Sequence, residues 1–313
     1  MSVLASFLAA AALTIAPQAN QPTTAQSRQA PAEEGVSQVE DVEVTARRLN
    51  EQVRSFVNEV ATPPYGRNLA RWDREICVGT ANIGPRYAQI MIDRVSTTAQ
   101  ELGLKIGEPG CRPDVMIVAS ADADAVARRM VEENPNGFRP AQASTDRGSA
   151  ALRRFQNTDA PVRWWHVSLP VAADTGEVAV RLIGEDPPTL AVRTASRLRA
   201  NVRDDLARVL IIIDANQMSA ISFGALTDYV TMIALAQIDP EADSSAFSSV
   251  LNVFDPTRQL TGFTNWDRDY LRGLYTADRD RAKPSQQVRD IVRQVVDANG
   301  SRQRAEEAET SPN

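Results

Sequence analysis

The chain has 313 residues but only one histidine, His166, and two cysteines, Cys77 and Cys111. One imidazole cannot supply the two or three histidines that most catalytic zinc sites use, and two cysteines fall short of the four ligands of structural zinc. The Gly-x-Ser-x-Gly motif of many hydrolases and the glycine-rich phosphate loop are also absent. We therefore expect no metal and no cofactor, while hydrolysis by a pair of carboxylates stays open.

Basic blocks and long apolar segments are missing as well. The net charge is −6, and charges of both signs are interspersed along the chain. This pattern argues against a nucleic-acid partner. The small and apolar run of residues 3–16 is shorter than the about 20 residues that a membrane-spanning helix needs. We expect no membrane span in the mature chain.

The N-terminal segment is typical of a secretory signal peptide. Its first 27 residues carry no charged side chain, and the apolar run is followed by Ala19 and Ala25 as cleavage positions. No Lys or Arg precedes the run, so a buried alanine-rich helix is the alternative interpretation. We expect residues 1–25 to be removed and the mature protein to be periplasmic or secreted.

The two cysteines, Cys77 and Cys111, fit this compartment. An even number of cysteines in an exported protein indicates a disulfide bond. Closing a loop of this length stabilises the fold by roughly 3–4 kcal/mol in the chain-entropy description. Two buried free thiols are the alternative.

The remaining chain predicts one domain with polar extensions. Residues 26–38 are rich in Pro, Ala, Gln, Ser and Thr, which favours a flexible linker. Residues 39–298 would form a single domain that opens with a half-exposed strand at 39–45, where apolar and acidic residues alternate. Residues 134–159 contain several Pro and Gly and predict a loop that covers a groove. The polar tail, 299–313, predicts disorder.

The stretch 206–275 carries the strongest patterns. The unbroken apolar run 209–213 predicts a strand buried on both faces. Residues 222–237 form a helix that is apolar on nearly every side and should be buried. A tight turn at 248–252 and an amphipathic helix within 260–275 follow, with Thr264 or Asn265 as the N-cap.

This order of strand, buried helix, turn and closing helix resembles the core of zinc metallopeptidases, the zincins. In that family the central helix carries H-E-x-x-H, whose histidines hold zinc and whose glutamate activates water. Here the motif aligns with residues 228–232, so that Asp228 and Met232 replace the ligands and Tyr229 replaces the base. Methionine is a poor zinc ligand. The resemblance therefore implies a scaffold without its zinc site.

The closing segments resemble the metzincin and matrixin branches of that family. Ser249-Val250-Leu251-Asn252 is similar to the turn beneath the zinc, with Leu251 in place of the methionine. Residues 260–275 are similar to the matrixin closing helix, L-T-x-x-D-x-x-x-L-x-x-L-Y. A proteobacterial family of unknown function with a degenerate active helix has the same ending. The resemblance implies a zincin-like α+β fold, in which a mixed β-sheet packs on a buried central helix.

Seven side chains are candidates for a cleft on this scaffold: Asp228, Tyr229, Met232, Leu251, His166, Trp164 and Trp165. Each also has a structural interpretation. Asp228 on an apolar helix predicts either a functional acid or a carboxylate paired with an arginine. His166 could face a ligand or make an ordinary hydrogen bond, and the tryptophan pair could stack on a ligand or pack in the core. The acidic segment 239–243 lacks the spacing of a calcium loop.

Without the zinc motif, we expect an exported, non-catalytic protein. It would bind a protein, peptide or small-molecule ligand of the cell envelope in the cleft that holds peptide in active zincins. One alternative is a hydrolase of non-zinc chemistry that uses Asp228, Tyr229 and His166 in the same cleft. A second alternative is a structural factor of the cell envelope.

Overall fold

The computed structural model describes residues 34–142, 145–189 and 199–310. The expected signal peptide, its cleavage positions and most of the expected linker lie outside these residues. The chain forms two compact units, Met1–Glu43 and Val44–Asn313. All contacts described below lie within the second unit.

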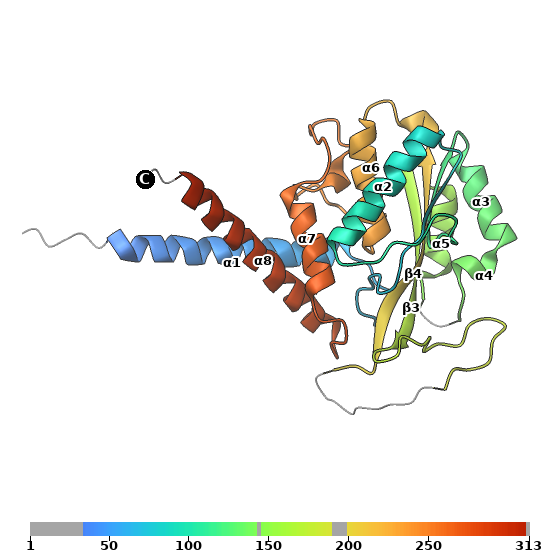
Figure 1. The fold of residues 1–313 in the computed structure, drawn as a ribbon, viewed down its shortest axis with the longest axis horizontal. Coiled ribbons are helices and arrows are strands. Elements are labelled where there is room, and N and C mark those ends of the chain that lie inside the picture. Colours follow the sequence, from blue (N-terminus) through green and yellow to red (C-terminus); the bar gives the residue numbers. More distant parts are fainter. Residues whose placement is uncertain (1–33, 143–144, 190–198, 311–313) are drawn as a thin grey trace, which may run out of the picture. The chain divides into compact units, whose positions relative to one another are not determined.

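The fold contains a four-stranded mixed sheet with the strand order β1-β2-β4-β3. Figure 1 labels its strands β3 and β4. Its strands are β1 (Val78–Ala81), β2 (Val115–Ser120), β3 (Val162–Ala172) and β4 (Val202–Asp214). The first, second and fourth strands are parallel, and β3 runs antiparallel to β4. Among the described strands, β3 therefore forms one edge of the sheet, and near its end Val171 makes an isolated antiparallel bridge to Val178.

Within the described residues the chain also forms eight α-helices and two short 3-10 helices. These are α1 (Glu34–Val60), α2 (Pro85–Glu101), α3 (Ala123–Glu133), α4 (Pro135–Phe138), α5 (Gly148–Asn157), α6 (Phe223–Leu235), α7 (Asn265–Thr276) and α8 (Pro284–Thr310), with η1 (Ala215–Gln217) and η2 (Val250–Asn252). The chain is thus an α+β fold, as its patterns predict.

Two apolar clusters cover the two faces of the sheet. Val209 and Ile211 of β4 face the larger cluster, which contains side chains of α1, α2, α6, α7 and α8. Leu210 and Ile212 face the smaller one, with side chains of α3, α4 and α5. Successive strand residues point to opposite faces. The unbroken apolar run at 209–213 is therefore buried on both sides, as predicted.

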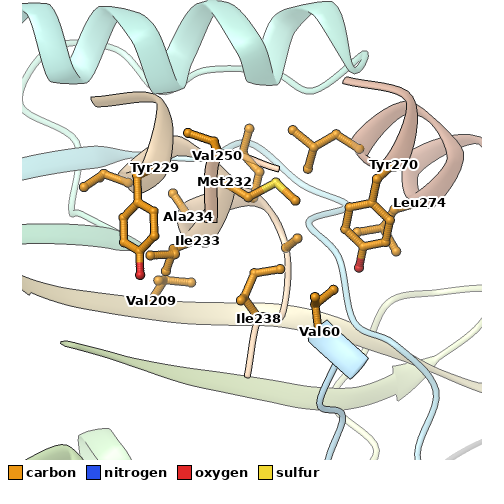
Figure 2. Packing of buried hydrophobic residues seen from close by; sticks show 14 of the residues in the cluster. Val60, Val209, Tyr229, Met232, Ile233, Ala234, Ile238, Val250, Tyr270 and Leu274 are labelled. Atoms are coloured by element: carbon orange, nitrogen blue, oxygen red, sulfur yellow. The ribbon is translucent and has the colours of Figure 1, made fainter. Parts of the chain in front are cut away.

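The buried central helix is α6, which begins and ends within the predicted range. Ser222 caps it by accepting a hydrogen bond from the amide of Ala225 at 3.2 Å. Every residue from Ala225 to Leu235 is buried. Figure 2 shows Met232 of this helix together with Tyr270 of α7 and Val209 of β4 in the larger cluster.

The start of the domain differs from its predicted strand. Residues 39–45 belong to helix α1. Val53, Phe56 and Val57 of this helix are buried at helical spacing. Adding a residue to a formed helix costs much less than starting one. This anchored end therefore explains a helix that extends through the alternating segment, and also through residues 34–38, which we expected to be a linker.

Two segments with no predicted secondary structure are helical. The tail continues as part of α8 to Thr310, because its run of Arg, Gln, Ala and Glu has high helix propensity. The predicted loop at 134–159 contains α4 and α5. Ala151 and Phe155 of α5 lie one helical turn apart and are buried against the sheet. This burial explains why the segment is helical although it begins with a glycine and ends with an asparagine.

Two other local predictions, the disulfide bond and the cap of α7, are confirmed. Cys77 and Cys111 form a disulfide bond with Cα atoms 6.0 Å apart. Thr264 caps α7 in a reciprocal arrangement with Asp267. In the part of the chain that the structure describes, no helix combines the length and the apolar character needed to cross a membrane.

Candidate functional site

A cavity of about 550 Å³ runs along the outer edge of β3. We call it the edge groove. Its walls are the first half of β3, helix α5 and the segment 237–241 that follows α6. Four of the seven predicted cleft residues line it: Trp164, Trp165, His166 and Tyr229. The structure therefore brings together residues from β3 and α6 that lie more than sixty positions apart in the sequence.

The backbone of β3 contributes to this groove. The amide of Asp214 in β4 donates to the carbonyl of Pro161 at 2.9 Å, which sets the hydrogen-bonded register of the pair. Alternate residues of an antiparallel edge strand direct their N–H and C=O groups away from the neighbour. Trp164 and His166 therefore direct their backbone N–H and C=O groups away from β4. Ser168 does the same, and its amide donates to the carbonyl of Thr145 at 2.9 Å.

Aromatic rings with fixed orientations form the apolar wall. The indole N–H of Trp164 donates to the carbonyl of Ile238 at 2.9 Å, and that of Trp165 donates to Phe138 at 2.9 Å. The Tyr229 ring meets Trp164 edge-on, with centroids 6.1 Å apart. It points from α6 toward the sheet (Figure 2). Burial raises the pKa of the Tyr229 phenol, so this side chain stays neutral.

His166 is held as a neutral imidazole. Burial lowers its pKa from 6.5 to about 4; the hydrogen bond to Ile233 opposes this effect, and the charge of Arg147 adds to it. The ring is neutral at pH 7, and Nε2 lies 2.8 Å from the carbonyl oxygen of Ile233. A carbonyl only accepts, so Nε2 carries the proton and Nδ1 is left as an acceptor.

Ion pairs close one rim of the groove. Arg147, at the start of α5, pairs with Asp239 at 2.6 Å and with Glu241 at 3.5 Å. Arg154, at the other end of α5, pairs with Glu241 at 2.8 Å. The acidic segment after α6 therefore holds α5 in place. These arginines carry no signal in the sequence, because the pairs join residues about ninety positions apart.

Asp228 does not line the edge groove. It forms an ion pair with Nε of Arg94 and accepts a hydrogen bond from the amide of Phe263 at 2.7 Å. Gly262 lies against it, because a Cβ atom at this position would be only 2.3 Å from the Asp228 carboxylate. Arg94 also lies over the Phe263 ring, 5.5 Å from its centroid. Each carboxylate oxygen of Asp228 therefore already accepts a hydrogen bond, one from Arg94 and one from Phe263.

The other two predicted residues belong to the core. Met232 is fully buried in the larger cluster, and Leu251 packs against that cluster from η2. Among the residues with described positions, no group of three or more His, Cys, Asp or Glu side chains is arranged to hold a metal ion.

The chain was compared with protein-family models, with curated proteins and with solved structures, and none of the three comparisons gave a match.

Proposed function

We propose that this chain is an exported, non-catalytic binding protein whose edge groove takes an extended peptide segment of a partner protein. The observation that carries the proposal is the position of the groove along an edge strand. There, the outward amide and carbonyl groups of Trp164 and His166 lie beside fixed aromatic rings. An extended chain can add to such an edge through backbone hydrogen bonds, while pockets select its side chains.

The scaffold is, in the same proposal, a zincin-like fold that has lost its zinc site. Its support is the antiparallel edge strand beside the buried helix α6, the turn at η2 and the capped helix α7. At the position of the zinc ligands, Asp228 is committed to Arg94 and to the amide of Phe263. Met232 is buried.

A non-catalytic role is further supported by the chemistry of the groove. His166 is the single imidazole of the chain. Its lowered pKa, about 4, makes it a weak base at neutral pH. Asp228 lies outside the groove. The three residues of the hydrolase alternative are therefore not brought to one reacting atom.

Export is supported by the Cys77–Cys111 disulfide, since disulfide bonds persist in oxidising compartments. The partner would then be a protein or peptide of the cell envelope.

The test is a selection of peptides from a random library on the purified mature protein, followed by a scan of N-methylation. Methylation removes one backbone donor at a time. If the peptide pairs with β3, methylating every second residue should weaken binding about tenfold or more, and methylating the residues between them should have little effect.

A blocking variant supplies the control. Ala150 is an exposed residue of α5 that lines the groove, and Ala150→Trp should abolish peptide binding. Ala121→Trp, at an exposed position outside the groove, should not. The proposal fails if N-methylation shows no alternation, if the two tryptophan variants bind alike, or if the purified protein shows zinc-dependent, chelator-sensitive peptide hydrolysis.

A further inference from the structure

A second cavity, of about 340 Å³, shares Trp165 with the edge groove and no other lining residue. Its walls are the loop before β2, the end of α3, the end of α4, and residues 208–210 of β4. The volume lies within the usual range for small-molecule sites, about 300–1,000 Å³.

Two guanidinium groups line this cavity. Arg208 is half-buried, and one of its N–H groups donates to the carbonyl of Gly137 at 3.0 Å. A guanidinium has five donors, so this contact leaves others for a ligand. Arg112 lies at the exposed rim, and the structure gives its side chain no hydrogen-bond or ion-pair partner among the described residues.

The two guanidinium groups line the same cavity. Burial lowers the pKa of Arg208, and the positive charge of Arg112 lowers it further, while Asp114 opposes both. Gly137 allows the approach of Arg208, because a Cβ atom there would lie 2.7 Å from its Nη1. An anion placed between two guanidinium groups would relieve their repulsion and accept charge-assisted hydrogen bonds.

The loop that carries Arg112 is held in place before any ligand arrives. Its neighbour Cys111 is bonded to Cys77. The amides of Asp114 and Val115 both donate to the carbonyl of Cys77, at 2.9 and 3.0 Å. A binding group on a preorganised loop loses little conformational entropy when a ligand is bound.

The remaining lining is apolar or already paired. Met116, Met130, Phe138, Trp165 and Leu210 supply an apolar surface. Of the two carboxylates, Asp114 is neutralised by Arg74 at 2.8 Å outside the cavity, and Glu133 is exposed at the end of α3. The charges of Arg112, Arg208 and Glu133 give the cavity a net charge of +1. This charge matches a ligand that carries a single negative charge.

We propose that this second cavity binds a small monocarboxylate with an apolar body, its carboxylate between Arg112 and Arg208 and its body on the methionine and aromatic side chains. Arginine recognises carboxylates through paired N–H donors, and the flexible thioethers of Met116 and Met130 adapt to differently shaped apolar groups. The proposal is independent of the peptide proposed for the edge groove.

The test is isothermal titration of the full mature protein with octanoate and with phenylpropionate, each against its neutral primary amide. At least one carboxylate should bind, and its amide should bind about tenfold or more weakly, because a hydrogen bond to a charged group contributes about 1.5–3 kcal/mol. Arg112→Ala should weaken carboxylate binding by a similar factor. Arg112 is exposed, so this variant should fold.

Two further variants make the result specific. Arg129→Ala removes an exposed arginine of α3 outside the cavity and should leave binding unchanged. Met130→Trp should fill the cavity and abolish binding. The proposal is overturned if neither carboxylate binds, if amide and carboxylate bind equally, or if Arg112→Ala and Arg129→Ala behave alike.

Discussion

Ser249 donates a hydrogen bond from its hydroxyl to the carboxylate of Asp267 across 2.6 Å, which joins the turn before η2 to the first turn of α7. The same carboxylate accepts from the amide of Val250 at 2.9 Å and from the amide of Thr264 at 3.0 Å. Asp267 is fully buried. One side chain therefore organises both the turn and the closing helix.

Asp267→Ala should consequently destabilise the fold by about 3 kcal/mol, because it leaves several buried donors without an acceptor. Urea unfolding of the variant measures this. Asp186→Ala, in an exposed loop, is the matched control and should change stability by less than about 0.5 kcal/mol. Equal unfolding midpoints for the two variants would contradict the role of Asp267.

The ion pair between Arg94 and Asp228 should behave as a coupled structural unit. In a double-mutant cycle with Arg94→Ala and Asp228→Ala, we expect a coupling free energy of about 1–2 kcal/mol, since the Asp228 side chain is largely buried. The exposed pair Arg128 and Asp124, 3.6 Å apart, should give about 0.3–0.5 kcal/mol. A coupling at Asp228 no larger than this would argue against the pairing.

His166 should make stability depend on pH in a defined window. The pKa of the His166 imidazole is 6.5 in the unfolded chain and about 4 in the folded protein. Between these values the unfolded chain binds the proton more tightly, so the folded state loses stability as the pH falls from 6.5 toward 4. The loss relative to a His166→Gln variant should reach roughly 3 kcal/mol at most.

The single imidazole makes this prediction easy to measure. Proton NMR of the folded protein should show one histidine resonance that titrates near pH 4, and urea unfolding of both proteins across the same window gives the free energies. A resonance that titrates near 6.5, or parallel pH profiles for the two proteins, would show that His166 is not held as described.

Removal of the disulfide with Cys77→Ser and Cys111→Ser should lower the free energy of unfolding by roughly 3–4 kcal/mol in the chain-entropy description. The two cysteines are separated by 34 positions. Dithiothreitol should shift the wild-type unfolding curve toward that of the double variant and leave the variant itself unchanged. An unchanged wild-type curve in the reduced state would contradict the stabilising role.

Metal analysis of the mature protein, purified without chelator or histidine tag, should find no stoichiometric zinc, and EDTA should leave its melting temperature unchanged. Asp228 and Met232 stand where the resemblance places the ligands, and methionine is a poor zinc ligand. One tightly bound zinc per chain would show that our interpretation of α6 is wrong.

The sequence predicts the elements whose signals are local. The strand at 209–213, the buried helix α6 and the capped start of α7 each carry their pattern within about fifteen residues, so periodicity and capping were enough to place them. The disulfide followed from cysteine number and compartment. At 39–45, alternation favoured a strand, but the buried helical face that begins at Val53 extended the helix through it.

Only one wall of the edge groove could be predicted, because only that wall is marked by local sequence signals. Trp164, Trp165, His166 and Tyr229 stood out by residue type, and the structure places them together. The opposite wall depends on α5, whose ten residues begin with Gly148 and contain only two buried apolar side chains. Its pairing with Asp239 and Glu241 across the groove depends on tertiary structure, which a pattern in one segment does not contain.

Trp165 lines both the edge groove and the second cavity, with its indole N–H fixed on the carbonyl of Phe138. The two cavities therefore share one fixed aromatic wall. Because the hydrogen bond to Phe138 holds this ring in place, an occupant of either cavity leaves the shape of the other unchanged. Coupling between two binding sites is reciprocal, so the peptide and the monocarboxylate would each bind with the same affinity whether or not the other is present.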